Sequence, residues 1–149
     1  MMFLQAIKSA KAPEAIGPYS PGVKLGDFVY LSGQIPLDPK TNELVAGGIK
    51  EQTNQVLENI LTLLAEIGLA TDHIVKTTVF LSDLADFAEM NEVYAEYFNA
   101  PYPARSTVQV AALPKNAKVE IECLVLDTLA YEQDNCAGCQ SSCDNGCCE

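Results

Sequence analysis

The clearest periodicity in the chain lies between residues 49 and 67. Its apolar side chains recur at helical spacing and share one face: Val56, Ile60, Leu63, Leu64 and Ile67. A helix with one apolar face buries that face against a second layer of structure. The next segment, residues 74–81, is rich in β-branched residues and alternates in polarity, which predicts a strand. A helix layer on a sheet is therefore the expected architecture.

The remaining elements follow from the same patterns. We predict a second helix over residues 85–98, started by Asp83 or Asp86. Further strands are predicted over residues 3–8, 27–32, 106–112 and 118–127. Residues 10–22 are predicted to form a loop, with a turn at 36–39 and a polar hairpin tip at Thr41-Asn42. Counting the return strand of that hairpin as the third strand, the predicted order is β-β-β-α-β-α-β-β, an α+β fold with two helices on one face of a mixed sheet.

The two ends of the chain differ in character. The first residues have no basic region followed by a long apolar stretch, so we predict no signal peptide and no membrane span. The expected location is the cytoplasm, where thiols stay reduced. We divide the chain into a domain over residues 1–129 and an acidic, Cys-rich tail over residues 130–149.

Charge excludes one class of partner. Nine basic residues stand against twenty acidic ones, a net charge of −11. A phosphate-backbone binder needs clustered Lys and Arg, so we expect no nucleic acid partner. The same sign disfavours an anionic membrane surface. Only one of the nine basic residues is an arginine, Arg105.

Two charged residues are candidates for chemistry. Arg105 follows a proline-rich turn at the mouth of a predicted strand, where a guanidinium could bind a planar carboxylate through two N–H groups. The alternative is a surface ion pair. Glu120 lies on the strand face that continues with Leu124 and Leu126, and a half-covered carboxylate needs a partner. The alternative is the solvated face of an edge strand.

Other familiar motifs are absent from the sequence. It contains neither a Walker motif nor the G-x-G-x-x-G fingerprint. The single histidine, His73, has no second histidine for a metal pair and is predicted to lie in a helix-to-strand loop. Met90 and the aromatic residues spaced along the second helix are predicted to be core residues rather than a cofactor site.

The tail carries five closely spaced thiols: Cys136, Cys139, Cys143, Cys147 and Cys148. In a reducing compartment they indicate a soft metal, such as Zn, Cu(I) or an Fe–S cluster, or redox chemistry. Their C-x2-C-x3-C-x3-C-C spacing matches no defined zinc motif well. The alternative is an appendage whose thiols have no role.

Six separated motifs occur in an order that resembles one known family. They are AIGPYS at 15–20, SGQIP at 32–36, IVKTTVF at 74–80, DF at 86–87 with Asn91, PARS at 103–106, and LPK at 113–115 followed by VEIE at 119–122. Together they resemble the RidA (YjgF-type) family of imine deaminases over about residues 3–127. The tail lies outside the resemblance.

The resemblance implies a chorismate-mutase-like α+β fold assembled as a homotrimer, with active sites between subunits. It implies hydrolysis of 2-imino acids or their enamine tautomers to 2-oxo acids and ammonia, with no cofactor for that step. The implied substrates are products of PLP-dependent Ser/Thr dehydratases. Arg105 would bind the substrate carboxylate and Glu120 would activate a water. The implied substrate-binding residues are Tyr19, Ser32, Gly33, Asn91 and Thr107.

One position departs from the family pattern. Members often have Cys two residues after the arginine, where this chain has Thr107. The role implied for that residue belongs to its backbone carbonyl, which threonine keeps. Two alternatives to imine deamination remain. One is a trimer that binds 2-oxo acids without turnover, with metal or thiol chemistry in the tail. The other is RNA cleavage, which the net charge argues against.

Overall fold

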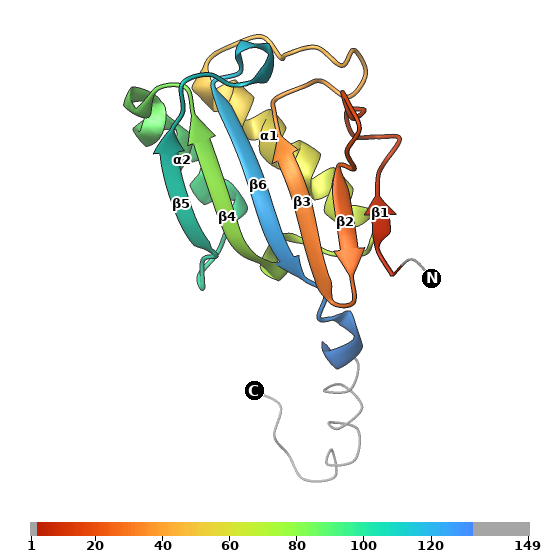
Figure 1. The fold of residues 1–149 in the computed structure, drawn as a ribbon. Helices are drawn as coiled ribbons and strands as arrows, with labels where there is room; N and C mark the ends of the chain where they lie inside the picture. The colour runs from red at the N-terminus through yellow and green to blue at the C-terminus, as the bar shows by residue number, and fades with distance from the viewer. Residues whose placement is uncertain (1–2, 133–149) are drawn as a thin grey trace.

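The computed structural model describes residues 3–132 and places six strands in one mixed sheet (Figure 1). The strands are β1 (Gln5–Ile7), β2 (Gly22–Leu25), β3 (Phe28–Gln34), β4 (Ile74–Leu81), β5 (Ala104–Gln109) and β6 (Val119–Leu126). They lie in the order β1-β2-β3-β6-β4-β5. The β4–β5 pair is parallel and the other neighbouring pairs are antiparallel.

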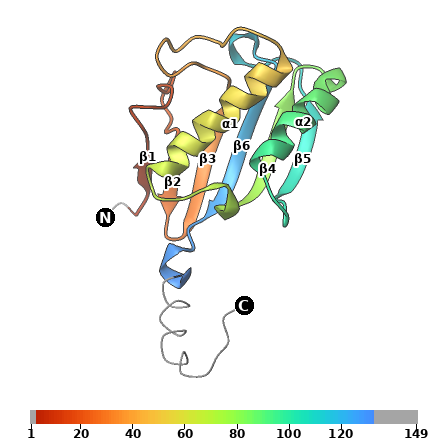
Figure 2. The ribbon, with the colours of Figure 1, turned by 180° about the vertical axis from the view of Figure 1, so that it is seen from behind.

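Two helices, α1 (Ile49–Ala65) and α2 (Phe87–Tyr97), pack side by side on one face of the sheet (Figure 2). This confirms the predicted α+β class. Helix α1 ends in a Schellman turn, in which the Leu69 N–H donates to the Leu64 carbonyl at 3.0 Å and Gly68 has a positive φ of 73°. A 3₁₀ turn (Leu84–Asp86) precedes α2, and Asp83 caps it by accepting from the Ala85 N–H at 2.8 Å. Asp86 occupies the N-cap position of α2 itself, but its side chain makes no capping hydrogen bond.

The core lies between the helices and one face of the sheet. Strand β6 shows the alternation that builds it, because Val119, Ile121, Cys123 and Val125 are buried under the helices. Burial raises the pKa of the Cys123 thiol to about 12, so this cysteine is an unreactive core residue. The intervening residues, Glu120 among them, point to the opposite face.

Three boundaries differ from the sequence prediction. Strand β2 starts at Gly22, within the predicted loop, and forms a tight hairpin with β3. Strand β5 starts at Ala104, so Arg105 lies inside the strand rather than at its mouth. The predicted hairpin after β3 contributes only one isolated bridge, Leu37 to Leu44, with Asn42 at a positive φ of 57° at its tip.

Among residues 3–132, no helix packs on the second face of the sheet, which we call the open face (Figures 1 and 2). Large apolar side chains there are 43–51% exposed: Leu25, Phe28, Tyr30 and Val108. Within residues 3–132, no helix is long and apolar enough to cross a membrane.

Candidate active site

Glu120 and Gly33 meet on the open face. A Cβ on Gly33 would lie 1.9 Å from Glu120 Oε1 and 2.7 Å from Glu120 Cδ, so only glycine lets the carboxylate lie this close to the β3 backbone. The pairing of β3 with β6 shifts register between Leu31 and Gln34, which places the glycine at an irregular point of the ladder. The Glu120 carboxylate therefore packs directly against the β3 backbone at Gly33.

The Glu120 carboxylate is half-buried, and none of the described residues forms an ion pair with it. Burial, with a smaller contribution from the negative charge of Glu122, raises its pKa above the ordinary value. A carboxylate in this state is a competent proton acceptor.

Tyr19 and Ser32 lie in the same region as Gly33. The Ser32 hydroxyl donates to the Ser20 carbonyl at 2.7 Å, and the Ser32 N–H donates to the Pro21 carbonyl at 2.9 Å. These bonds fasten the loop that carries Tyr19, whose hydroxyl accepts from the Ile16 N–H at 3.2 Å. The Ser32 hydroxyl therefore acts as a hydrogen-bond donor that fixes the Tyr19 loop against β3.

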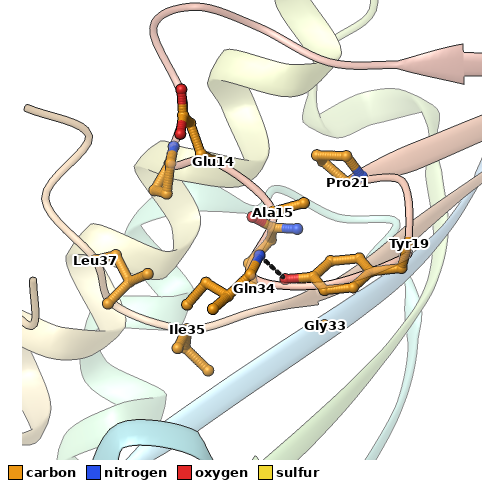
Figure 3. Close-up of a pocket in the computed structure, with 10 residues that line it drawn as sticks. Glu14, Ala15, Tyr19, Pro21, Gly33, Gln34, Ile35 and Leu37 are labelled. Atoms are coloured by element: carbon orange, nitrogen blue, oxygen red, sulfur yellow. Dashed lines mark hydrogen bonds between the residues drawn. The ribbon is translucent and has the colours of Figure 1, made fainter. Parts of the chain in front are cut away.

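Tyr19 and Gly33 line a pocket between this loop and the end of β3 (Figure 3). The pocket has a volume of about 30 Å³, room for a water but not for an amino acid.

Arg105 lies under α2 on the helix-covered face. Its Cζ is 4.6 Å from the centroid of the Tyr94 ring and 5.7 Å from that of Phe87. With Asn91 and Tyr102 it lines an open cleft of about 380 Å³. Among residues 3–132, no carboxylate lies within 4 Å of the guanidinium, so the surface ion pair considered from sequence does not occur there.

Thr107 follows two residues along β5 and points to the same side as Arg105, because side chains alternate along a strand. It pairs in register with the buried Val79. Its hydroxyl oxygen is buried and has no hydrogen-bond partner in the described part of the chain. Thr107 therefore lies beside Arg105, and its hydroxyl makes no hydrogen bond to residues 3–132.

Strand register puts Arg105 and Glu120 on opposite faces of the sheet. Arg105 pairs with Thr77 and Glu120 pairs with Phe80, and directly paired residues point to the same face. Thr77 and Phe80 are three residues apart, so they point to opposite faces. One chain therefore brings together Tyr19, Ser32, Gly33 and Glu120 as one group, and Asn91, Arg105 and Thr107 as another.

The aromatic partners of Arg105 were not predicted. Tyr94 was predicted to be a core residue, and it is only 6% exposed, but its contact with the guanidinium was not foreseen. The available signal was the seven-residue spacing of Phe87 and Tyr94, which puts both rings on one side of α2.

The remaining candidates lie elsewhere. The His73 Nδ1 accepts from the Ala70 N–H at 3.1 Å in a 3₁₀ turn before β4, the predicted connecting position. No cluster of three metal-ligating side chains occurs among residues 3–132. The thiols Cys136, Cys139, Cys143, Cys147 and Cys148 lie outside the described residues.

The fold and these two groups define a class of protein: an α+β domain that displays a half-buried carboxylate and a guanidinium held by aromatic rings. Comparison with known proteins gives the family. The model of the Endoribonuclease L-PSP family matches residues 9–126. The chain belongs to this family, which includes the RidA, YjgF and RutC proteins.

Named relatives cover most of the chain. It is 46% identical over 122 residues to the human 2-iminobutanoate/2-iminopropanoate deaminase, covering 82% of this chain and 89% of that protein. It is 51% identical over 120 residues to Reactive Intermediate Deaminase A, chloroplastic, of Arabidopsis thaliana, covering 80% and 64%. The crystal structure of E. coli TdcF with bound serine has 47% identity and a TM-score of 0.78, covering 82% and 98%.

Proposed function

We propose that this protein hydrolyses 2-imino acids, or their enamine tautomers, to 2-oxo acids and ammonia. Two charged groups carry the proposal, the Arg105 guanidinium and the half-buried Glu120 carboxylate, neither of which forms an ion pair within residues 3–132. The names of the human and plant relatives, both deaminases, support the same reaction.

In this proposal Arg105 binds the substrate carboxylate and Glu120 moves protons. Glu120 accepts a proton from water as the water oxygen bonds to the imine carbon and the C=N π electrons move to nitrogen. Glu120 then returns that proton to the nitrogen. The second water proton moves to nitrogen as the C–N bond breaks, which releases ammonia and leaves the 2-oxo acid. The chemistry needs no cofactor.

We infer that the two groups combine between chains of a homotrimer. Because Arg105 and Glu120 lie on opposite faces of their sheet, a complete site needs the arginine group of one copy and the glutamate group of another. The exposed apolar side chains of the open face supply a surface suited to burial against a second copy. Light scattering should give three times the mass of the chain, and a monomer that retains full activity would contradict this assembly.

The test of the reaction is clearance of the imine formed by a threonine dehydratase. Arg105→Ala should lower kcat/KM by about 10- to 100-fold, because a charge-assisted bidentate contact contributes about 1.5–3 kcal/mol. Lys50→Ala, which removes an exposed cation paired with Glu92, is the matched control and should keep full activity. An unchanged rate for Arg105→Ala would show that the assigned site is wrong.

The alternative function is a trimer that binds 2-oxo acids without turnover. It predicts heat of binding in calorimetry, no imine clearance, and no effect of Glu120→Gln. Glu122→Gln provides the matched carboxylate control, because Glu122 lies two residues along the same strand and is exposed. The proposed location is the cytoplasm.

RNA cleavage, which the family description names, is not our proposal. The net charge of −11 and the scarcity of arginine give the chain little attraction for a phosphate backbone. We therefore expect no salt-dependent binding of RNA.

A further inference from the structure

Arg105 is held without any acidic partner from the described chain. A buried or half-buried guanidinium usually pairs with a carboxylate. Here the groups beside it are two rings of α2, with Cζ to centroid distances of 4.6 Å for Tyr94 and 5.7 Å for Phe87. Both distances lie within the range of a cation–π contact.

The Tyr94 ring is itself fixed. Its hydroxyl shares a 2.8 Å hydrogen bond with the Thr77 hydroxyl, and Thr77 is fully buried. The ring also stacks on Phe98 with centroids 4.4 Å apart. Thr77 is the residue that pairs in register with Arg105 across β4 and β5. Thr77, Tyr94 and Arg105 therefore contact one another pairwise, and these contacts fix the position of the guanidinium relative to the sheet.

Support by rings differs chemically from support by a carboxylate. A ring contacts the flat face of the guanidinium, whereas a carboxylate takes N–H groups along its edge. An internal carboxylate would occupy the donors that a substrate carboxylate needs. Aromatic contacts hold Arg105 without using its N–H groups, and no carboxylate of residues 3–132 forms an ion pair with them.

We propose that Tyr94, held by Thr77 and assisted by Phe87, is a positioning residue that presents Arg105 to a carboxylate ligand. The inference rests on the proposed function for the identity of the ligand. It goes further in assigning carboxylate affinity to an aromatic residue that was expected only to fill the core.

The experiment measures carboxylate binding separately from turnover. Calorimetry with 2-oxobutanoate gives Kd, and the coupled imine assay gives kcat and KM. Tyr94→Leu removes the ring and should raise both Kd and KM about 5- to 10-fold, the size of a partly desolvated cation–π contact, with kcat changed less than about twofold. Tyr94→Phe and Thr77→Val keep the ring and should raise Kd less than about threefold.

Two further variants keep the test decisive. Tyr97→Phe is the control on the same helix, because the Tyr97 hydroxyl binds Asn54 and Glu58 at 2.6 and 2.7 Å rather than the Arg105 region, and Kd should not change. Phe87→Leu alters a partly exposed ring and should raise Kd two- to threefold even if Tyr94→Leu does not fold.

The outcomes separate the two proposals. Tyr94→Leu and Phe87→Leu variants that lose thermal stability but keep the wild-type Kd would overturn the positioning role. A wild-type protein that binds 2-oxobutanoate without clearing imine would contradict the deaminase function. The positioning role would still be tested by comparing the Kd of the variants with that of the wild type. Wild-type protein that clears imine but binds no 2-oxobutanoate would contradict the carboxylate affinity assigned to Arg105 and Tyr94 and would leave the deaminase function standing.

Discussion

The Glu120 carboxylate lies directly over the α-carbon of Gly33, at a place where a Cβ would come within 1.9 Å of Oε1. The two residues come from neighbouring strands, β6 and β3, and are 87 positions apart in the sequence. The position of the proposed proton acceptor therefore depends on the absence of a side chain on the next strand.

Gly33→Ala should lower activity far more than stability. The added methyl group meets only the end of a flexible side chain, which can turn away, so the melting temperature should change little. The displaced carboxylate should lower kcat/KM about 10- to 100-fold, because small misplacements of a catalytic group carry such costs. The measurements are a thermal melt and the coupled imine assay.

The control for this variant is Gly48→Ala at the start of α1, where an added Cβ meets Glu51 Oε2 at an ordinary 3.7 Å. It should keep wild-type activity. Equal loss of activity in both variants would show that the Glu120–Gly33 contact has no special role.

Glu122→Gln should shift the acid limb of the pH–rate profile to lower pH. Burial and the charge of Glu122 both raise the pKa of Glu120, and glutamine removes the charge. Since Glu120 must be ionised to accept a proton, activity falls as pH drops through its pKa. An acid limb that does not move in the variant would mean that another group controls it.

Glu120→Gln should stabilise the fold at neutral pH relative to wild type. A pKa raised by folding means that ionisation of Glu120 is less favourable in the folded than in the unfolded chain. Protonated Glu120 therefore contributes stability below pH 4.5, and this contribution is lost as the pH rises through the folded-state pKa of Glu120. Melting curves should therefore show a gain for the variant at pH 7 and none at pH 4.

Thr107→Val should raise the free energy of unfolding by about 1 kcal/mol, because it removes a buried hydroxyl that has no partner among residues 3–132. Thr53→Val, at a second buried hydroxyl of this kind, should act similarly. Imine clearance by Thr107→Val should stay within about twofold of wild type, because the role implied for this residue belongs to its backbone. A tenfold loss would assign the hydroxyl to the site.

Truncation after Glu132 should leave activity and melting temperature unchanged. The predicted boundary after residue 129 is less favourable, because the Tyr131 hydroxyl donates to Asp27 Oδ2 at 2.6 Å and Glu132 lies 3.3 Å from His73 Nε2. Truncation after Leu129 removes both contacts and should lower the melting temperature by a few degrees. If truncation after Leu129 abolishes activity while truncation after Glu132 does not, these two contacts belong to the functional domain.

Elemental analysis decides between the two interpretations of the tail thiols Cys136, Cys139, Cys143, Cys147 and Cys148, which are a soft-metal site and an appendage whose thiols have no role. Protein purified under reducing conditions should show either near-stoichiometric Zn or Fe, which truncation after Glu132 would remove, or no metal at all. Metal-free protein in which all five thiols titrate freely would contradict the soft-metal site.

Local patterns predicted much of the fold. The spacing of apolar residues in α1 and the alternation in β6 are properties of short segments, and both elements form where predicted. Strand β2 was missed because four residues between a proline-rich loop and a tight turn carry almost no periodicity. Its pairing with β3 comes from tertiary contact.

The individual residues of the candidate site could be predicted from the sequence, but their positions relative to one another could not. Arg105 and Glu120 could be selected by residue type and by the family resemblance. Their separation onto opposite faces depends on how β5 and β6 register with β4, which long-range pairing sets. The contact between Arg105 and Tyr94 has the same origin, since it needs α2 to cross β5 at one particular position.

The display of Arg105 and Glu120 on opposite faces has a genetic consequence under the proposed assembly. A chain defective in one group still carries the other intact group to its neighbour. Two alleles, one altered at Arg105 and one at Glu120, would each encode a protein without a working site, yet mixed assemblies of their products would contain complete sites. Loss-of-function alleles of this gene would then fall into two complementing classes, one for each face of the sheet.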